Sequence, residues 1–148
     1  MPAPDLHAIA VAAKATLDAA SITLNGNTLR VYATEPTGLD RLPAATVRLD
    51  SFQRRNLDDG EIELGSVMWD VLWRVTVYTP LDEAHTGQEG MLTVLAAVLD
   101  AFDDDPTLGG VVDDAVLTSG EQSFTDDESQ PRQLVVMDCD LLTRARST

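Results

Sequence analysis

The chain has 148 residues, of which 44% are hydrophobic, so it is long enough for one domain with a buried core and too short to favour two. Ten Lys and Arg against 25 Asp and Glu give a net charge of −15, with Lys14 as the single lysine. This charge repels DNA phosphates and anionic lipids, which argues against nucleic-acid binding or membrane docking as the main function. No apolar run approaches the roughly 20 residues of a transmembrane helix. We expect residues 1–148 to form a single domain.

The amino-terminal part of the chain predicts one helix and one strand. Asp5 is placed to cap a helix from about Leu6 to Ala20, in which apolar side chains recur every three or four positions. Asn25-Gly26 is a strong turn signal. Apolar and polar residues then alternate from Leu29 to Ala33, which predicts a short strand that ends before Pro36.

Two longer strands follow, with a polar loop between them. The segment from Ala44 to Phe52 alternates, and its apolar face carries Ala45, Val47 and Leu49. The segment from Gln53 to Gly65 loses this pattern and predicts a loop longer than a hairpin needs, which is either mobile or used for contact. Every second residue from Val67 to Val77 is Val or Trp, which predicts a strand with one face in the core.

A second helix is predicted from about Thr86 to Phe102 by its wide apolar face. Its first four residues have the form of a capping box, Thr-Gly-Gln-Glu, although a start near Asp82 remains open. Pro106 ends the helix, and glycines that tolerate positive φ are expected to turn the chain into the next strand through Leu108, Gly109 and Gly110.

Two more strands complete the chain, from about Val111 to Ser119 and from Gln133 to Ala145, with an acidic loop predicted from Gly120 to Pro131. The order is therefore helix, three strands, helix, two strands. Short links between strands favour antiparallel pairing, and both helices can cover the same side of the sheet. The predicted fold class is α+β, a mainly antiparallel five-stranded sheet with two helices packed on one face.

No residue pattern predicts a catalytic, cofactor or metal site. His7 and His85 lack the companions that a zinc site or an acid–base pair needs, and we expect both at the surface. Asp138 and Asp140 flank Cys139, a candidate core residue, and lie about 7 Å apart on one strand face. They could hold a metal or act as an acid–base pair, but a solvated or channel-facing sheet surface explains them better in so acidic a chain.

The strand that begins at Val67 also predicts an interface. Trp69 and Trp73 share one face with four valines, which is typical of a core. The opposite face mixes apolar and charged side chains and is a candidate subunit or partner interface, through Met68, Asp70, Leu72, Arg74 and Tyr78. The polar loop before this strand adds four charged candidates: Arg54, Arg55, Asp58 and Asp59.

The stretch from Trp73 to Leu117 holds a Trp-Arg-Val-Thr-Val-Tyr strand, a long Leu/Val helix, and Asp-Pro-Thr-Leu-Gly-Gly-Val-Val before the next strand. This order resembles the tail-terminator and tail-completion proteins of long-tailed bacteriophages. The resemblance implies a ring, usually of six subunits, that caps the tail tube and presents a surface to the head connector. It implies no catalytic residues.

The partners that this resemblance implies are further copies of the chain, the major tail tube protein and the head–tail connector protein, in a virion assembled in the host cytoplasm. DNA would pass through the ring without specific binding, and an acid-rich channel lining would keep it from adhering. Two alternatives of the same class remain open: another neck component (a connector or stopper) and a tail-tube-like protein. So does a different class, a small acidic cytoplasmic enzyme or ligand-binding domain that uses Asp138 and Asp140.

Overall fold

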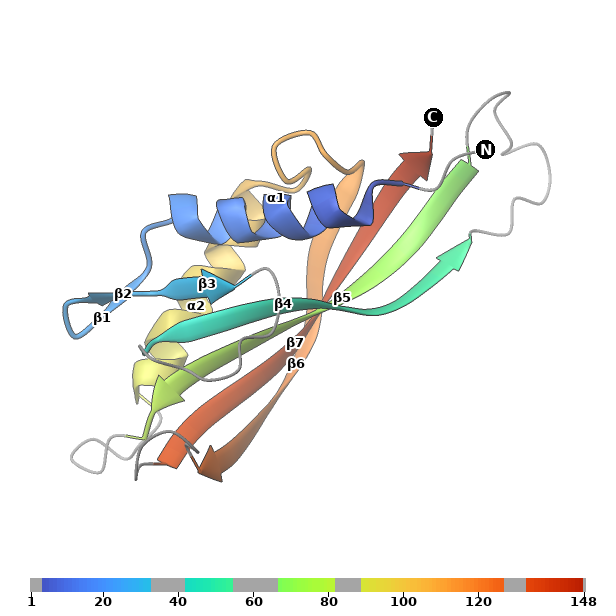
Figure 1. The fold of residues 1–148 in the computed structure, drawn as a ribbon. Helices are drawn as coiled ribbons and strands as arrows, with labels where there is room; N and C mark the ends of the chain where they lie inside the picture. Colours follow the sequence, from blue (N-terminus) through green and yellow to red (C-terminus); the bar gives the residue numbers. More distant parts are fainter. Residues whose placement is uncertain (1–3, 33–41, 55–66, 82–88, 127–132, 148) are drawn as a thin grey trace.

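The computed structural model describes residues 4–32, 42–54, 67–81, 89–126 and 133–147. The elements in chain order are α1 (Leu6–Ala19), β1 (Thr23–Leu24), β2 (Asn27–Thr28), β3 (Arg30–Tyr32), β4 (Ala44–Arg54), β5 (Val67–Pro80), α2 (Glu89–Asp104), β6 (Asp114–Asp126) and β7 (Gln133–Ser147). Apart from the added β1–β2 hairpin this is the predicted order, and the α+β class is confirmed (Figure 1). None of the described helices is long and apolar enough to cross a membrane.

The main sheet has five strands in the order β3-β4-β5-β7-β6, and both helices pack on one side of it (Figure 1). The three pairings from β4 to β6 are antiparallel, as predicted. The β3–β4 pairing is parallel, with Arg30 opposite Ala44 and Tyr32 opposite Thr46. A parallel pair needs a connection long enough to return to the same end of the sheet, and the chain between Tyr32 and Ala44 supplies that length.

Local signals set the amino-terminal elements. The backbone N–H of Ala8 donates a hydrogen bond to Oδ1 of Asp5 at 3.0 Å, so the predicted N-cap of α1 is confirmed. Asn25 and Gly26 have φ of 52° and 81° and form the two-residue turn between β1 and β2. Positive φ at both turn residues matches the twist of a hairpin, which explains why this Asn-Gly pair turns the chain so tightly.

The second helix ends later than predicted, at Asp104. Thr86 and the alternative start near Asp82 lie outside the described residues, so the start of the helix is described only from Glu89. The strand after it, β6, continues to Asp126, so the prediction of a loop from Gly120 is wrong for its first part. Because β6 is an edge strand, with β7 as its one neighbour in the described part of the chain, most of its polar side chains stay in solvent and its sequence looks like that of a loop.

Strand β4 is also longer than predicted, and the burial of its side chains changes along its length. It runs to Arg54, so Gln53 belongs to a strand and not to a loop. Its first four residues are buried, whereas every residue from Arg48 to Arg54 is exposed. Leu49 lies on the side of the helices as predicted, yet it is 42% exposed, because β4 runs away from the helices toward its end (Figure 1).

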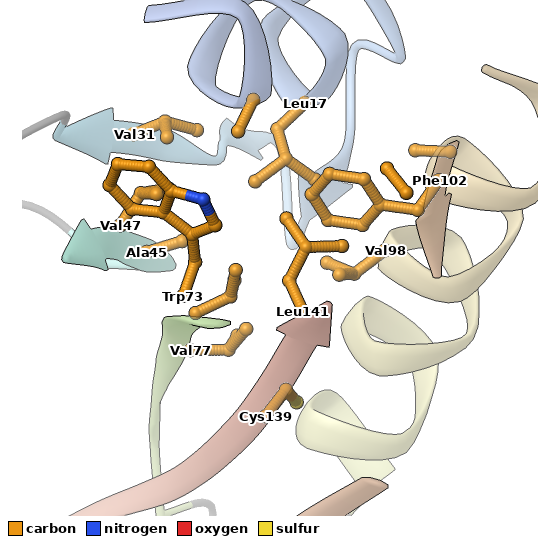
Figure 2. Close-up of a cluster of buried hydrophobic side chains, with 14 of the residues drawn as sticks. Leu17, Val31, Ala45, Val47, Trp73, Val77, Val98, Phe102, Cys139 and Leu141 are labelled. Atoms are coloured by element: carbon orange, nitrogen blue, oxygen red, sulfur yellow. The ribbon is translucent and has the colours of Figure 1, made fainter. Parts of the chain in front are cut away.

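The core lies between the helices and the sheet. Leu17 of α1, Val98 and Phe102 of α2, and Leu141 of β7 meet there with almost no exposed surface (Figure 2). Trp73 belongs to this core as predicted, and Trp69 packs against its margin. Further members come from the predicted apolar faces of β4 and β5: Ala45, Val47, Val71, Val75 and Val77.

Candidate protein interface

The side chains of β4 to β7 that point away from the helices form what is here named the open face. Register places Leu72 of β5 opposite Leu142 of β7, and Leu142 opposite Val116 of β6. Leu72 and Leu142 are half-buried by their neighbours, while Val116 is 44% exposed. These three residues are named the apolar row. They cross the middle of the open face at one level.

Ion pairs border the apolar row on the side of Arg74 and Asp140, which lie two residues from Leu72 and Leu142 along β5 and β7. Arg74 lies between two carboxylates, with Nη2 3.6 Å from Oδ1 of Asp50 and Nε 3.6 Å from Oδ1 of Asp140. Ser119 donates a hydrogen bond from Oγ to Oδ2 of Asp140 at 3.2 Å. Both arginine contacts are longer than a hydrogen bond, so the charges compensate one another without fixing a single geometry.

Ion pairs border the apolar row on its second side as well. Asp70 of β5 lies opposite Arg144 of β7, and Nε of Arg144 donates to Oδ1 of Asp70 at 3.2 Å. Beyond them, Nε of Arg146 is 3.5 Å from Oδ2 of Asp113. An apolar centre with a charged, hydrogen-bonded border is the usual composition of a protein–protein interface.

One end of the open face is covered by the chain itself. Tyr78 packs in a small cluster that is separate from the main core and contains Leu42, Ala44, Leu134 and Val136. Leu42 comes just before β4 and is buried on this cluster. Tyr78, one of the predicted interface residues, is therefore half-buried within the chain, and the exposed part of the open face lies toward Leu72.

The other predicted interface residues divide into two groups. Met68, Asp70, Leu72 and Arg74 alternate along one strand face and lie together on the open face, half-buried. Arg54 is the exposed last residue of β4. The remaining three candidates lie outside the described residues: Arg55, Asp58 and Asp59.

Asp138 and Asp140 lie on the open face, but each already has a neighbour. Thr76 donates a hydrogen bond from Oγ1 to Oδ1 of Asp138 at 2.8 Å, and Asp140 contacts Arg74 and Ser119. Within the described ranges, no group of three or more His, Cys, Asp and Glu residues could hold a metal ion.

Cys139, between these two aspartates, points into the core on the side of the helices (Figure 2). Burial raises the pKa of its thiol from 9.0 to about 11, and the charges of Asp138 and Asp140 add to that rise. The thiol therefore stays protonated near neutral pH, which makes it a poor nucleophile.

The turn after α2 holds the end of that helix to α1 and to the core. Leu108, Gly109 and Gly110 have φ of 49°, 71° and 91°, so the predicted positive φ of the glycines is confirmed and the leucine shares it. Asp105 fixes this turn: it accepts from the backbone N–H of Gly109 and from Oγ1 of Thr16, each at 2.8 Å. Asp105 thus ties the end of α2 to α1, while the buried Leu108 anchors the turn in the core.

The sequence alone did not predict the residues that other strands contribute to the candidate interface. Leu142, Val116 and Arg144 join the residues of β5 only through the register of the sheet. The consecutive pair Leu141-Leu142 was the available signal, because one leucine of such a pair in a strand must face away from the core.

A scan against protein-family models finds no match for this chain, and a search of curated proteins finds none either.

Proposed function

We propose that this chain is a structural subunit of the head–tail joint of a long-tailed bacteriophage, a tail terminator that forms a ring on the end of the tail tube. The observation that carries the proposal is the apolar row between two borders of ion pairs on the open face. The resemblance of Trp73 to Leu117 to tail-terminator proteins supplies the class of partner, namely the tail tube or the head connector.

The ion pairs make the open face suitable for burial. A partner that covers the apolar row removes the remaining exposed surface of Leu72, Leu142 and Val116 from water. Full burial of one such side chain from full exposure contributes roughly 1.5–3 kcal/mol, so each of these partly buried residues contributes a fraction of that. The neighbouring charges are already compensated, because Asp70 faces Arg144 and Arg74 lies between two carboxylates. A contact confined to the apolar row and these ion pairs therefore keeps each arginine beside a carboxylate, which lowers the usual cost of covering charged surface.

On the described surface, acidic side chains gather at the end of α2 and the following turn, through Asp100, Asp103, Asp104 and Asp105. Such a surface repels phosphate. In a ring with DNA in its channel, it is the part of the described chain best suited to face that DNA. The open face, where arginines and carboxylates alternate, suits contact with protein.

The test uses Leu142→Arg, which puts a charge into the apolar row of the open face. The purified protein is mixed with tail tubes of the phage that encodes it and is sedimented. We expect the wild-type protein to sediment with the tubes and the variant to bind at least about tenfold more weakly, since a desolvated unpaired charge costs more than 1.4 kcal/mol. Leu92→Arg is the matched control, because Leu92 is a 57% exposed leucine on α2.

Three results would separate the possibilities. Equal binding by both variants would remove the open face from the contact. Binding to the head connector but not to tail tubes would assign the chain to the connector or stopper class. A protein that binds neither and stays monomeric at every concentration in light scattering would refute the proposed function.

A further inference from the structure

Among the residues that the structure describes, the main sheet ends on both sides in strands without a second neighbour. There, β6 pairs only with β7 along its whole length. On the other side, β3 covers only Ala44 to Thr46, so β4 has only β5 beside it from Leu49 to Arg54 within the described chain. An exposed strand edge offers backbone N–H and C=O groups that can pair with another strand.

The two edges carry opposite charge. The edge formed by β3 and β4 holds Arg30, Arg48 and Arg54 against one acid, Asp50. Asp50 already lies near Arg74, so it offsets little of that positive charge. The described side chains of the β6 edge include two acids, Asp114 and Glu121, and no base. In a chain with a net charge of −15, copies repel each other across most surfaces, and contact between these two edges is attractive.

Strand direction suits the same contact. β4, β5, β7 and β6 alternate in direction, so β4 and β6 run in opposite senses within one subunit. If neighbouring copies are related by a rotation about an axis roughly parallel to the strands, each strand points the same way in every copy. Strand β4 of one copy is then antiparallel to β6 of the next. Because the two edges differ, the contact is head-to-tail, and repetition of one rotation can close it into a ring.

Exposed apolar side chains lie beside both edges on the side of the helices. Phe52 of β4 is 62% exposed and lies opposite Val71, while Phe124 of β6 is 54% exposed and lies opposite Val135. Each edge strand has a bulge, after Leu49 in β4 and after Leu117 in β6. Regular edge remains beyond the bulges, from Ser51 in β4 and from Ser119 in β6.

We propose that the β4 edge of one copy, Ser51 to Arg54, pairs with the β6 edge of the next, within Ser119 to Asp126, so that the sheet continues from subunit to subunit. This inference rests on the proposed function only in requiring self-association. It assigns contact between copies to the two edges and leaves the open face for other parts of the tail.

Charge reversal tests the pairing. Arg54→Glu removes the positive excess of the β3–β4 edge and makes its proposed pairing segment, Ser51 to Arg54, acidic, and Glu121→Lys weakens the acidic edge. Arg54 lies opposite Trp69 on the helix side and Glu121 lies opposite Asp138 on the open face, so the two act through the charge of their edges and not as a direct pair. Each change should therefore raise the dissociation constant between copies by about twofold. The double variant again places an acid on one pairing segment and a base on the other, and should recover part of the loss. Lys14→Glu on α1 and Asp100→Lys on α2 make the same charge changes elsewhere and should leave assembly unchanged. Sedimentation velocity over a concentration series measures each constant.

Hydrogen exchange gives an independent readout of the backbone contact. Amides of residues 51–54 and 119–126 should become protected as the wild-type protein assembles, in addition to those already paired in the monomer. If copies assemble while these amides and the charge-reversed variants behave as in the controls, the edge pairing is wrong and the proposed function survives. If wild-type copies never assemble, both are wrong.

Discussion

The two faces of the sheet are built from the same strands, and β7 shows the difference residue by residue. Toward the helices it places Cys139, Leu141 and Thr143, all of them buried. Toward solvent, the intervening residues Asp140 and Leu142 are only half-buried. The helix-covered face is buried within one chain, whereas the apolar row of the open face is partly exposed. Neighbours in sequence therefore differ in whether they are buried in the fold or lie on the face that we propose as a protein contact.

The largest expected difference is between two adjacent leucines. Leu141→Ala should lower the free energy of unfolding by about 2–5 kcal/mol, because it leaves a cavity in the core. Leu142→Ala should cost about 1 kcal/mol or less in the monomer, because its side chain is half-buried on the open face. Urea denaturation of the monomer measures both values. Equal costs would mean that the open face is as much a core as the helix-covered face.

The next two variants compare the stability that a buried hydrogen bond contributes with the stability that an ion pair on the open face contributes. Oγ1 of Thr143 accepts from Nε1 of Trp73 at 3.1 Å and donates to the carbonyl of Val71 at 2.9 Å. Thr143→Val should cost about 1–3 kcal/mol, because the buried indole N–H loses its acceptor. Arg144→Ala, which removes the contact with Asp70, should cost less than about 1 kcal/mol. Thermal unfolding should rank the two variants in this order, and the reverse rank would contradict it.

The smallest effect concerns the pH dependence of stability. The pKa of Cys139 rises from 9.0 to about 11 on folding, so its contribution to stability is fully present below pH 9.0 and is lost as the pH rises toward about 11. Between pH 8 and pH 9.5 this loss should be less than about 1 kcal/mol. Cys139→Ala should remove that part of the pH dependence, as measured by urea denaturation at both values. An unchanged pH dependence in the variant would show that the thiol ionises as easily in the fold as in the unfolded chain.

Elements with one buried face were predictable from the sequence. The alternation from Val67 to Val77 predicts β5, because half of its side chains enter the core. The second half of β6 has the sequence of a loop, because Gly120, Glu121 and Ser123 show no apolar alternation. An edge strand that is exposed on both faces has no reason to alternate, so only its backbone pairing with β7 reveals it.

Only the residues that β5 contributes to the candidate interface were predictable from the sequence. The mixed face of β5 indicated Leu72 and its neighbours, but the partners Leu142 and Val116 required the register between strands. The same limit applies to the bond from Thr16 to Asp105, which joins residues 89 positions apart. Local periodicity carries no information about pairs at such separations.

Electron microscopy of tail tubes incubated with the purified protein tests the central claim most directly. The account predicts a ring of subunits at one end of each tube and no further growth when more tube protein is added. Tubes that keep both ends bare and continue to lengthen, in the presence of excess folded protein, would contradict it.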